Sequence, residues 1–264
     1  MWLPEQLGLM FLAGVAAAGL NSVAGGGSFV SVPALIFLGL DPVRANATST
    51  LSLWMAWLST GTAFRKELAG TRALLSRFIV PGALGGVVGA FILVRTPSHV
   101  FERLFPWLLF LATLVFAFGD RLRQVAGSNA AHHPEPLSAA SPGRRLLLGV
   151  TMGAVALYAG YFGGGTGFLV LALLSLHGMT ELHQMNAIKS ALAILINSFA
   201  LVTLMITGTI DWIPGVCMGL GGLVGGYLGP LLARRIRPVL LRRVVVGVGL
   251  LMTVVFVVRA YSPN

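Results

Sequence analysis

Long apolar segments alternate with short polar stretches along the whole chain. This pattern is typical of a protein whose helices lie in a lipid bilayer. We expect ten such segments, over residues 6–20, 28–40, 47–64, 78–94, 104–118, 146–160, 166–176, 188–207, 213–233 and 244–258. A longer polar stretch follows the fifth segment, at residues 119–145. It contains three prolines and is expected to be a flexible loop.

The second half of the chain repeats the outline of the first half. Gly25-Gly26-Gly27-Ser28 interrupts the first apolar stretch, and Gly163-Gly164-Gly165-Thr166 interrupts the corresponding stretch of the second half. Each string leads into another apolar segment and then into an Asn-Ala pair, Asn46-Ala47 or Asn186-Ala187. We therefore predict an all-α membrane protein with two repeats of about five membrane elements each. The predicted division is 1–118 for the first repeat, 119–145 for a linker and 146–264 for the second repeat.

The glycine strings are expected to break the helices that contain them. As one straight helix, residues 6–40 would be about 52 Å long, whereas the hydrocarbon core of a bilayer is about 30 Å thick. Glycine adopts helix-ending conformations at little steric cost, so the break is expected at Gly25–Gly27. The two pieces, of about 13 residues each, would be too short to span upright and would fold as a hairpin that reaches partway into the bilayer. Pro33 favours an irregular course for the second piece.

The composition excludes an ordinary soluble domain. Hydrophobic residues make up 56% of the chain, charged residues 10%, and the mean hydropathy is +0.87; soluble domains carry about 25% charged residues. The net charge of +10 comes from bases in short loops between apolar segments. This distribution favours the positive-inside rule over nucleic-acid binding. A single cysteine, Cys217, excludes an intramolecular disulfide.

The basic residues also predict the topology. If each broken pair crosses the membrane an even number of times, 14 of the 18 bases lie on one side, in loops 65–77 and 234–243, in the linker, and at Lys189. The positive-inside rule makes that side cytoplasmic. Loop 65–77 holds four bases while its counterpart near 208–212 holds none, so the two halves are expected to have inverted orientations.

The helix ends beside the glycine strings are the first candidate binding site. The segments that follow them begin at Ser28 and Thr166, which are good N-cap residues, and a helix N-terminus offers unpaired N–H groups to an anion. The alternative is that glycines only allow close helix packing, which we favour for the glycines on the full-length segments. The candidate residues of the breaks are Asn21, Ser22, Gly25, Gly26, Gly27, Ser28, Gly163, Gly164, Gly165 and Thr166. The candidate packing glycines are Gly82, Gly85, Gly86, Gly89, Gly221, Gly222, Gly225 and Gly226.

A second group of polar residues opens the segment that follows each broken pair. Its members are Asn46, Thr48, Ser49, Asn186, Lys189 and Ser190, all of which can donate hydrogen bonds. Lys189 either faces a substrate or extends its ammonium group to the cytoplasmic interface, and both interpretations stay open. Asn197 lies within a segment and could bind substrate or bridge helices.

Several kinds of chemistry are not supported by the residues. Every Asp and Glu falls in a loop or at a segment end, which argues against a carboxylate proton relay or a carboxylate cation site in the membrane. The histidines lack a third ligand at a suitable spacing for a metal. No nucleotide-binding, hydrolase or metalloprotease motif occurs. We therefore expect a protein that is not an enzyme and needs no metal or other cofactor.

Taken together, these motifs resemble the TauE/SafE sulfite exporter family. The first-half similarity rests on Gly25-Gly26-Gly27-Ser28, Val32-Pro33-Ala34-Leu35 and Ala45-Asn46-Ala47-Thr48-Ser49. The second-half similarity rests on Gly163-Gly164-Gly165-Thr166-Gly167 and Asn186-Ala187-Ile188-Lys189-Ser190. It covers nearly the whole chain except the linker. The halves differ, because Lys189 replaces the serine of the first half and Pro33 has no counterpart in the second.

The resemblance implies a bacterial inner-membrane transporter of sulfur-containing anions, such as sulfite or an organosulfonate like sulfoacetate. We expect it to export the anion by alternating access, with the basic loops and the linker in the cytoplasm. The expected partners are a small anionic substrate and the lipid bilayer, without nucleic acid; self-association is left open. The alternatives are an importer or carrier of another small anion or sulfur compound, and a membrane scaffold that does not transport.

Overall fold

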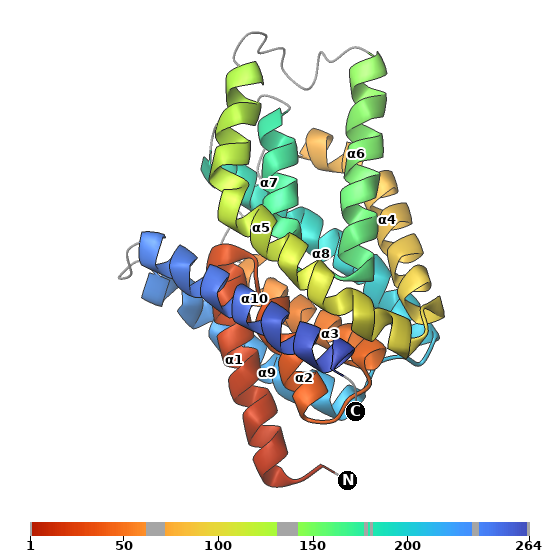
Figure 1. Cartoon of the computed structure of the whole chain (residues 1–264). Coiled ribbons are helices and arrows are strands. Elements are labelled where there is room, and N and C mark those ends of the chain that lie inside the picture. Colours follow the sequence, from red (N-terminus) through yellow and green to blue (C-terminus); the bar gives the residue numbers. More distant parts are fainter. Residues whose placement is uncertain are drawn as a thin grey trace.

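A computed structural model describes residues 2–61, 72–130, 142–176, 179, 182–233 and 238–262. Within this part of the chain the regular structure consists of ten α-helices and no strands (Figure 1). Seven of the ten predicted apolar segments lie entirely within one of these helices. Segments 28–40 and 188–207 extend past the ends of their helices, and the last three residues of segment 47–64 lie outside the described residues. The helices are α1 (Pro4–Ala24), α2 (Ser28–Phe37), α3 (Pro42–Gly61), α4 (Arg72–Arg95), α5 (Ser98–Ala130), α6 (Pro142–Tyr161), α7 (Thr166–Leu176), α8 (Leu182–Ile206), α9 (Trp212–Ala233) and α10 (Pro238–Tyr261).

Local sequence signals account for several helix ends. Helices α1, α3, α6 and α10 all begin at a proline, whose fixed φ suits the first helical position and whose missing N–H would be unpaired there in any case. The Asp41 carboxylate caps α3 by accepting hydrogen bonds from the backbone N–H groups of Val43 at 3.0 Å and Arg44 at 3.3 Å. Helix α1 ends at Gly25, whose φ of 74° is the left-handed conformation that glycine adopts without strain.

Three expectations about local structure are wrong. Helix α1 has 21 residues, not about 13, and at 1.5 Å per residue it is about 31 Å long, which is enough to cross a bilayer. Pro33 lies inside α2 without interrupting this helix of 10 residues. The expected flexible loop at 119–145 is partly helical, because α5 continues to Ala130 and α6 begins at Pro142. Residues 131–141 of that loop, and the basic residues at 65–71 and 234–237, lie outside the described residues.

The chain is a multi-pass membrane protein. Five helical stretches are long and apolar enough to cross a bilayer: Leu75–Arg95, Ser98–Phe118, Ala187–Ile206, Trp212–Gly229 and Arg243–Tyr261. Large apolar side chains such as Leu84, Val150 and Val254 are exposed on the outside of these helices and of α6. Such a surface is costly in water and suits contact with lipid.

The helices form two bundles that exchange one helix each. The first bundle consists of α1, α2, α3 and α9, and the second consists of α4, α6, α7 and α8. Thus α9, from the second half of the chain, packs against α1 and α3, while α4, from the first half, packs against α6 and α8. Helices α5 and α10 pack on each other (Figure 1). Helix α5 contacts α3 of the first bundle and α7 of the second, whereas α10 contacts α1 and α2 of the first bundle.

The same pairings recur when each helix is replaced by its counterpart in the other half, so that α1 is exchanged with α6, α2 with α7, and so on to α5 with α10. The contacts α1–α9, α3–α9, α2–α3 and α5–α7 correspond in this way to α6–α4, α8–α4, α7–α8 and α10–α2. The second bundle also has a hydrophobic core of its own, which includes Phe78, Met152, Leu174 and Ile188. The internal repeat of the sequence is therefore matched by a repeat in how the helices pack.

Glycines allow the exchanged helices to approach their partners closely. A Cβ at Gly221 or Gly225 of α9 would overlap the backbone of α1, and a Cβ at Gly85 or Gly89 of α4 would overlap the backbone of α6. Such contacts are typical of helix packing in membranes, where small residues let two helices approach closely and gain van der Waals contact. The packing role predicted for these four glycines is confirmed.

Candidate functional site

The two glycine breaks meet at the interface between the bundles. A Cβ built on Gly25 would lie 3.7 Å from the Cα of Gly167, and a Cβ built on Gly167 would lie 3.8 Å from the Cα of Gly25. The α1–α2 break of the first bundle therefore contacts the first turn of α7 in the second bundle. We call this place the junction. The sequence pattern predicts the two breaks, and the fold brings them together.

At the first break, Asn21 accepts hydrogen bonds from two backbone N–H groups of the turn, while two other N–H groups have no described acceptor. Its backbone carbonyl accepts from the N–H of Gly25 at 2.9 Å, and its side-chain Oδ1 accepts from the N–H of Gly27 at 3.4 Å. The N–H groups of Gly26 and Ser28 have no acceptor among the described residues. Both lie at the N-terminal end of α2, where the helix dipole favours negative charge.

The second break is organised in a similar way by Tyr158. Its hydroxyl donates to the carbonyl of Gly164 at 2.8 Å, and its backbone carbonyl accepts from the N–H of Gly163 at 3.3 Å. The N–H groups of Gly164, Gly165 and Gly167 find no acceptor in the described part of the chain. The sequence analysis missed Tyr158, although a hydroxyl in an apolar segment, five positions before a glycine string, is a signal for such a role.

The predicted N-caps are wrong. The N-cap of α2 is Gly27, which makes no side-chain capping bond, and Ser28 is already the first helical residue. Thr166 opens α7, but its hydroxyl donates back to the carbonyl of Gly163 at 2.9 Å. Both hydroxyl residues therefore lie one position later than a cap, and the N–H groups of the first turns stay uncapped. Uncapped first turns suit an anion that would replace the cap.

Lys189 reaches the junction from α8. Its side chain is only 7% exposed, and its Cδ would lie 3.3 Å from a Cβ built on Gly167. No hydrogen-bond or ion-pair partner for its ammonium group exists among the described residues. Of the two interpretations open from the sequence, this burial disfavours an ammonium group that extends to the interface. The partial positive charge at the N-terminus of α7 repels the Lys189 ammonium group. A negative charge placed between them would stabilise both.

Asn46 lies beside the second break from the other bundle. Its Nδ2 donates to the carbonyl of Tyr161, the last residue of α6, at 2.9 Å. Its Oδ1 is buried and has no hydrogen-bond partner, and it is the only such side-chain atom in the described part of the protein. A buried acceptor without a partner is uncommon in folded proteins and calls for an explanation.

The remaining predicted residues divide between the junction side and other surfaces of the helices. The Ser49 hydroxyl lies 2.6 Å from that of Ser31 on α2, a residue that the sequence analysis missed. Thr48 instead faces α9, where its hydroxyl accepts from the backbone N–H of Asp211 at 3.0 Å. The Ser22 hydroxyl donates to the carbonyl of Gly19 in its own helix at 2.9 Å. Ser190 is buried next to Lys189, and the side chain of Asn186 lies outside the described residues.

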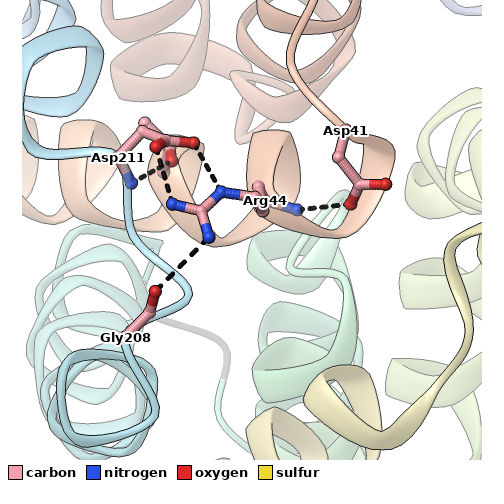
Figure 2. A network of polar contacts seen from close by, with 5 residues as sticks. Asp41, Arg44, Gly208 and Asp211 are labelled. Carbon is pink, nitrogen blue, oxygen red and sulfur yellow. Dashed lines mark hydrogen bonds and ion pairs between the residues drawn. The ribbon is translucent and has the colours of Figure 1, made fainter.

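Two ion pairs between charged side chains lie away from the junction. Arg44 binds Asp211 in bidentate fashion, with Nη2 2.7 Å from Oδ1 and Nε 2.9 Å from Oδ2, and Asp41 lies at the start of the same helix (Figure 2). Near the start of α5, Glu102 pairs with Arg259 of the last turn of α10 at 3.3 Å. These acids are therefore not partners of Lys189. Across the described ranges, no three His, Cys, Asp or Glu side chains come together as metal ligands.

The ten helices of the described ranges, with a lipid-facing exterior and a polar junction of broken helices, fit a multi-pass membrane protein of the transporter class. The chain belongs to the sulfite exporter TauE/SafE family, whose profile matches residues 10–256. It is therefore a membrane transporter of that family, and the resemblance seen in the sequence is confirmed.

Curated relatives support the same class. A probable membrane transporter protein of Haemophilus influenzae is 25% identical over 251 residues, which cover 94% of this chain and 93% of the relative. The probable membrane transporter protein YfcA of Escherichia coli is 26% identical over 257 residues, covering 95% and 89%. A probable membrane transporter protein of Sinorhizobium, ORF9, is 27% identical over 225 residues, covering 84% and 81%. No solved structure matches the chain.

Proposed function

We propose that this protein exports a small sulfur-containing anion, such as sulfite or an organosulfonate, across the bacterial inner membrane. The substrate would bind at the junction, and the two bundles would rock about it to expose the site to each side in turn. The lipid bilayer and this anion are its proposed partners. The basic loops and the linker would face the cytoplasm, as the positive-inside rule predicts.

One observation carries the proposal: the largely buried side chain of Lys189 reaches the junction, and its ammonium group has no partner among the described residues. Removing a charge from water costs several kcal/mol unless it is paired. The free N–H groups at Gly26, Ser28 and Gly167 add partial positive charge at the same place. An anion that contacts both helix ends and Lys189 would satisfy all of these groups together.

The packing repeat supports alternating access. Inverted repeats allow one protein to form two related states, open to opposite sides, around a single site. The junction lies where the bundles meet, with Gly25 in the first bundle and Gly167 in the second. An anion held there would contact both bundles, so its binding would depend on how the bundles are arranged.

The membrane potential favours export of an anion. Moving one negative charge outward across an inside-negative membrane gains about 2.3 kcal/mol per 100 mV. In the described residues no carboxylate lies at the junction to couple export to protons. Export driven by the potential alone would need no such group.

Flux into proteoliposomes tests the proposal. Uptake of radiolabelled sulfite or sulfoacetate is measured under an imposed potential, for wild type, Lys189→Ser and Lys189→Arg. Lys189→Ser installs the residue that the first half has at this position, Ser49. We expect it to lower anion flux at least tenfold, because a paired buried charge contributes about 1.4 kcal/mol or more. Lys189→Arg keeps the charge and should retain more flux.

A matched control removes a basic residue from the outer surface. Arg259 is half-exposed and pairs with Glu102, away from the junction, so Arg259→Gln should leave the flux near wild type. Anion flux that is absent in wild type would refute transport of these anions. Flux that is unchanged in Lys189→Ser would refute the junction as the binding site.

A further inference from the structure

The orientation of the Asn46 side chain is fixed by its one hydrogen bond. A backbone carbonyl can only accept, so the group 2.9 Å from the Tyr161 carbonyl must be the NH₂ of the amide. The Oδ1 atom then points elsewhere and is the buried side-chain acceptor without a described partner. Exchanging the two ends of the amide would place two acceptors in contact and would leave the NH₂ unpaired.

The surroundings of Asn46 connect it to the junction. Its partner, Tyr161, is the last residue of α6 and lies two positions before the second glycine string, and Tyr158 donates a hydrogen bond to Gly164 in that string. One turn further along α3, Ser49 contacts Ser31 of α2, the helix that follows the first string. Asn46 is 2% exposed and therefore belongs to the buried wall between the two broken pairs.

An unpaired hydrogen-bond acceptor in this wall restricts which ligands can satisfy every polar group of the junction. The N–H groups and Lys189 at the junction are all donors, and they suit the oxygens of an anion. Oδ1 is the opposite kind of group, because it can only accept. A ligand that satisfies every group must present oxyanion oxygens to the donors and an N–H or O–H to Asn46.

We propose that Asn46 selects substrates that carry their own hydrogen-bond donor beside the oxyanion group. The class includes protonated monoanions and sulfonates with an adjacent amino or hydroxyl group. A fully ionised anion such as sulfoacetate near neutral pH brings no donor and would leave Oδ1 unpaired. This inference rests on the proposed function, since it concerns the substrate of the same junction.

The test compares two anions of nearly the same shape and charge, of which only one carries a hydrogen-bond donor. Sulfamate, H₂N–SO₃⁻, and methanesulfonate, CH₃–SO₃⁻, differ in whether an NH₂ or a methyl group is bound to sulfur. Their Kd values are measured by calorimetry on the purified full-length protein. We expect wild type to bind sulfamate about 10-fold to 100-fold more tightly, because methanesulfonate leaves the buried acceptor unpaired.

Replacing Asn46 should remove this preference. In Asn46→Leu the ratio of the two Kd values should fall close to one, through weaker binding of sulfamate. Asn46→Ala provides the same test without a branched side chain, should Asn46→Leu fail to fold. The sequence left open whether Asn197 binds substrate or bridges helices, but its Nδ2 donates to the carbonyl of Ala193 in its own helix at 2.7 Å. Asn197→Leu is therefore the matched control. That variant should keep the wild-type ratio.

Each contrary outcome is distinct. Equal binding of the two anions by wild type overturns the role of Asn46, because it means that water or nothing pairs with Oδ1, while the anion site itself stands. A preference that survives in both Asn46 variants also overturns it. Stabilisation by Na⁺ over choline that disappears in Asn46→Leu would assign Oδ1 to a cation instead. If neither anion binds and the flux experiment is also negative, the proposed function fails, and this inference fails with it.

Discussion

Alanine substitutions at two glycines on the same helix should change stability in opposite directions. Gly82 and Gly85 both lie in α4, but Gly82 faces α8 and Gly85 faces α6. A Cβ at Gly85 would lie 2.5 Å from the Gly153 carbonyl oxygen, about 0.9 Å short of ordinary contact at 3.4 Å. A Cβ at Gly82 would lie 3.4 Å from Ile196 Cγ1, which is ordinary contact.

The magnitudes follow from these distances. Gly85→Ala must push α4 away from α6 or distort both helices, and overpacking of this kind costs about 1–3 kcal/mol. The better helix propensity of alanine offsets about 1 kcal/mol of that cost. Gly82→Ala keeps this gain without a clash. The free energies of unfolding of the two variants should therefore differ by about 1–3 kcal/mol, with Gly82→Ala the more stable.

Thermal unfolding of the purified protein in detergent measures this difference. One kcal/mol corresponds to about 2–4 °C in Tm for chains of about 150–250 residues. We expect the Tm of Gly82→Ala to equal or exceed that of wild type and the Tm of Gly85→Ala to fall below it. A Gly85→Ala variant as stable as wild type, or two variants that shift together, would refute the close approach of α4 and α6.

Two further predictions concern polar contacts between helices. A double-mutant cycle with Arg44→Gln and Asp211→Asn should give a coupling energy of about 0.5–1 kcal/mol in thermal unfolding, because the pair is bidentate but its side chains are 43% and 30% exposed; a coupling of zero would contradict a formed ion pair. Trp54→Phe should lower stability by about 0.5–1.5 kcal/mol, since it removes the 2.8 Å bond from Trp54 Nε1 to Ser198 Oγ that joins the two bundles. The same substitution made in a Ser198→Ala background should cost clearly less, and an equal cost would show that the bond contributes nothing.

Hydrophobic patterning was sufficient to predict the elements of this fold. In the described residues each apolar segment forms a helix over most of its length, because a backbone in lipid must pair its own polar groups. Patterning failed where polar residues continue a helix past its apolar part, as at the start of α6 and the end of α5. It also could not reveal the exchange of α4 and α9, since the partner of an apolar surface is set by side-chain fit and not by hydropathy.

The candidate site was predicted in outline but not in detail. The glycine strings and Lys189 stand out because glycines in a helix and a charge in an apolar segment are both costly without a role. Thr48 and Ser49 are neighbours in the same motif, yet one faces α9 and the other faces α2. Only the rotation of α3 decides this. The bond from Asn46 to Tyr161 joins residues 115 positions apart, so no local pattern could indicate it.

The exchange of α4 and α9 between the bundles determines how a ligand at the junction could shift the balance between two arrangements of the bundles. Because α4 and α9 each belong to the bundle of the other half, neither half can form its bundle alone, and the two bundles must assemble together. The junction then lies between two bodies that are each held by their own close helix contacts. A ligand shifts the balance between two arrangements only by binding one of them better. A ligand held by a single bundle would bind both arrangements alike, whereas one held by Gly26 and Ser28 from one side and Gly167 and Lys189 from the other would not. Under the proposed alternating access, the position of the break in each half, and not only its polarity, would therefore suit the junction to transport.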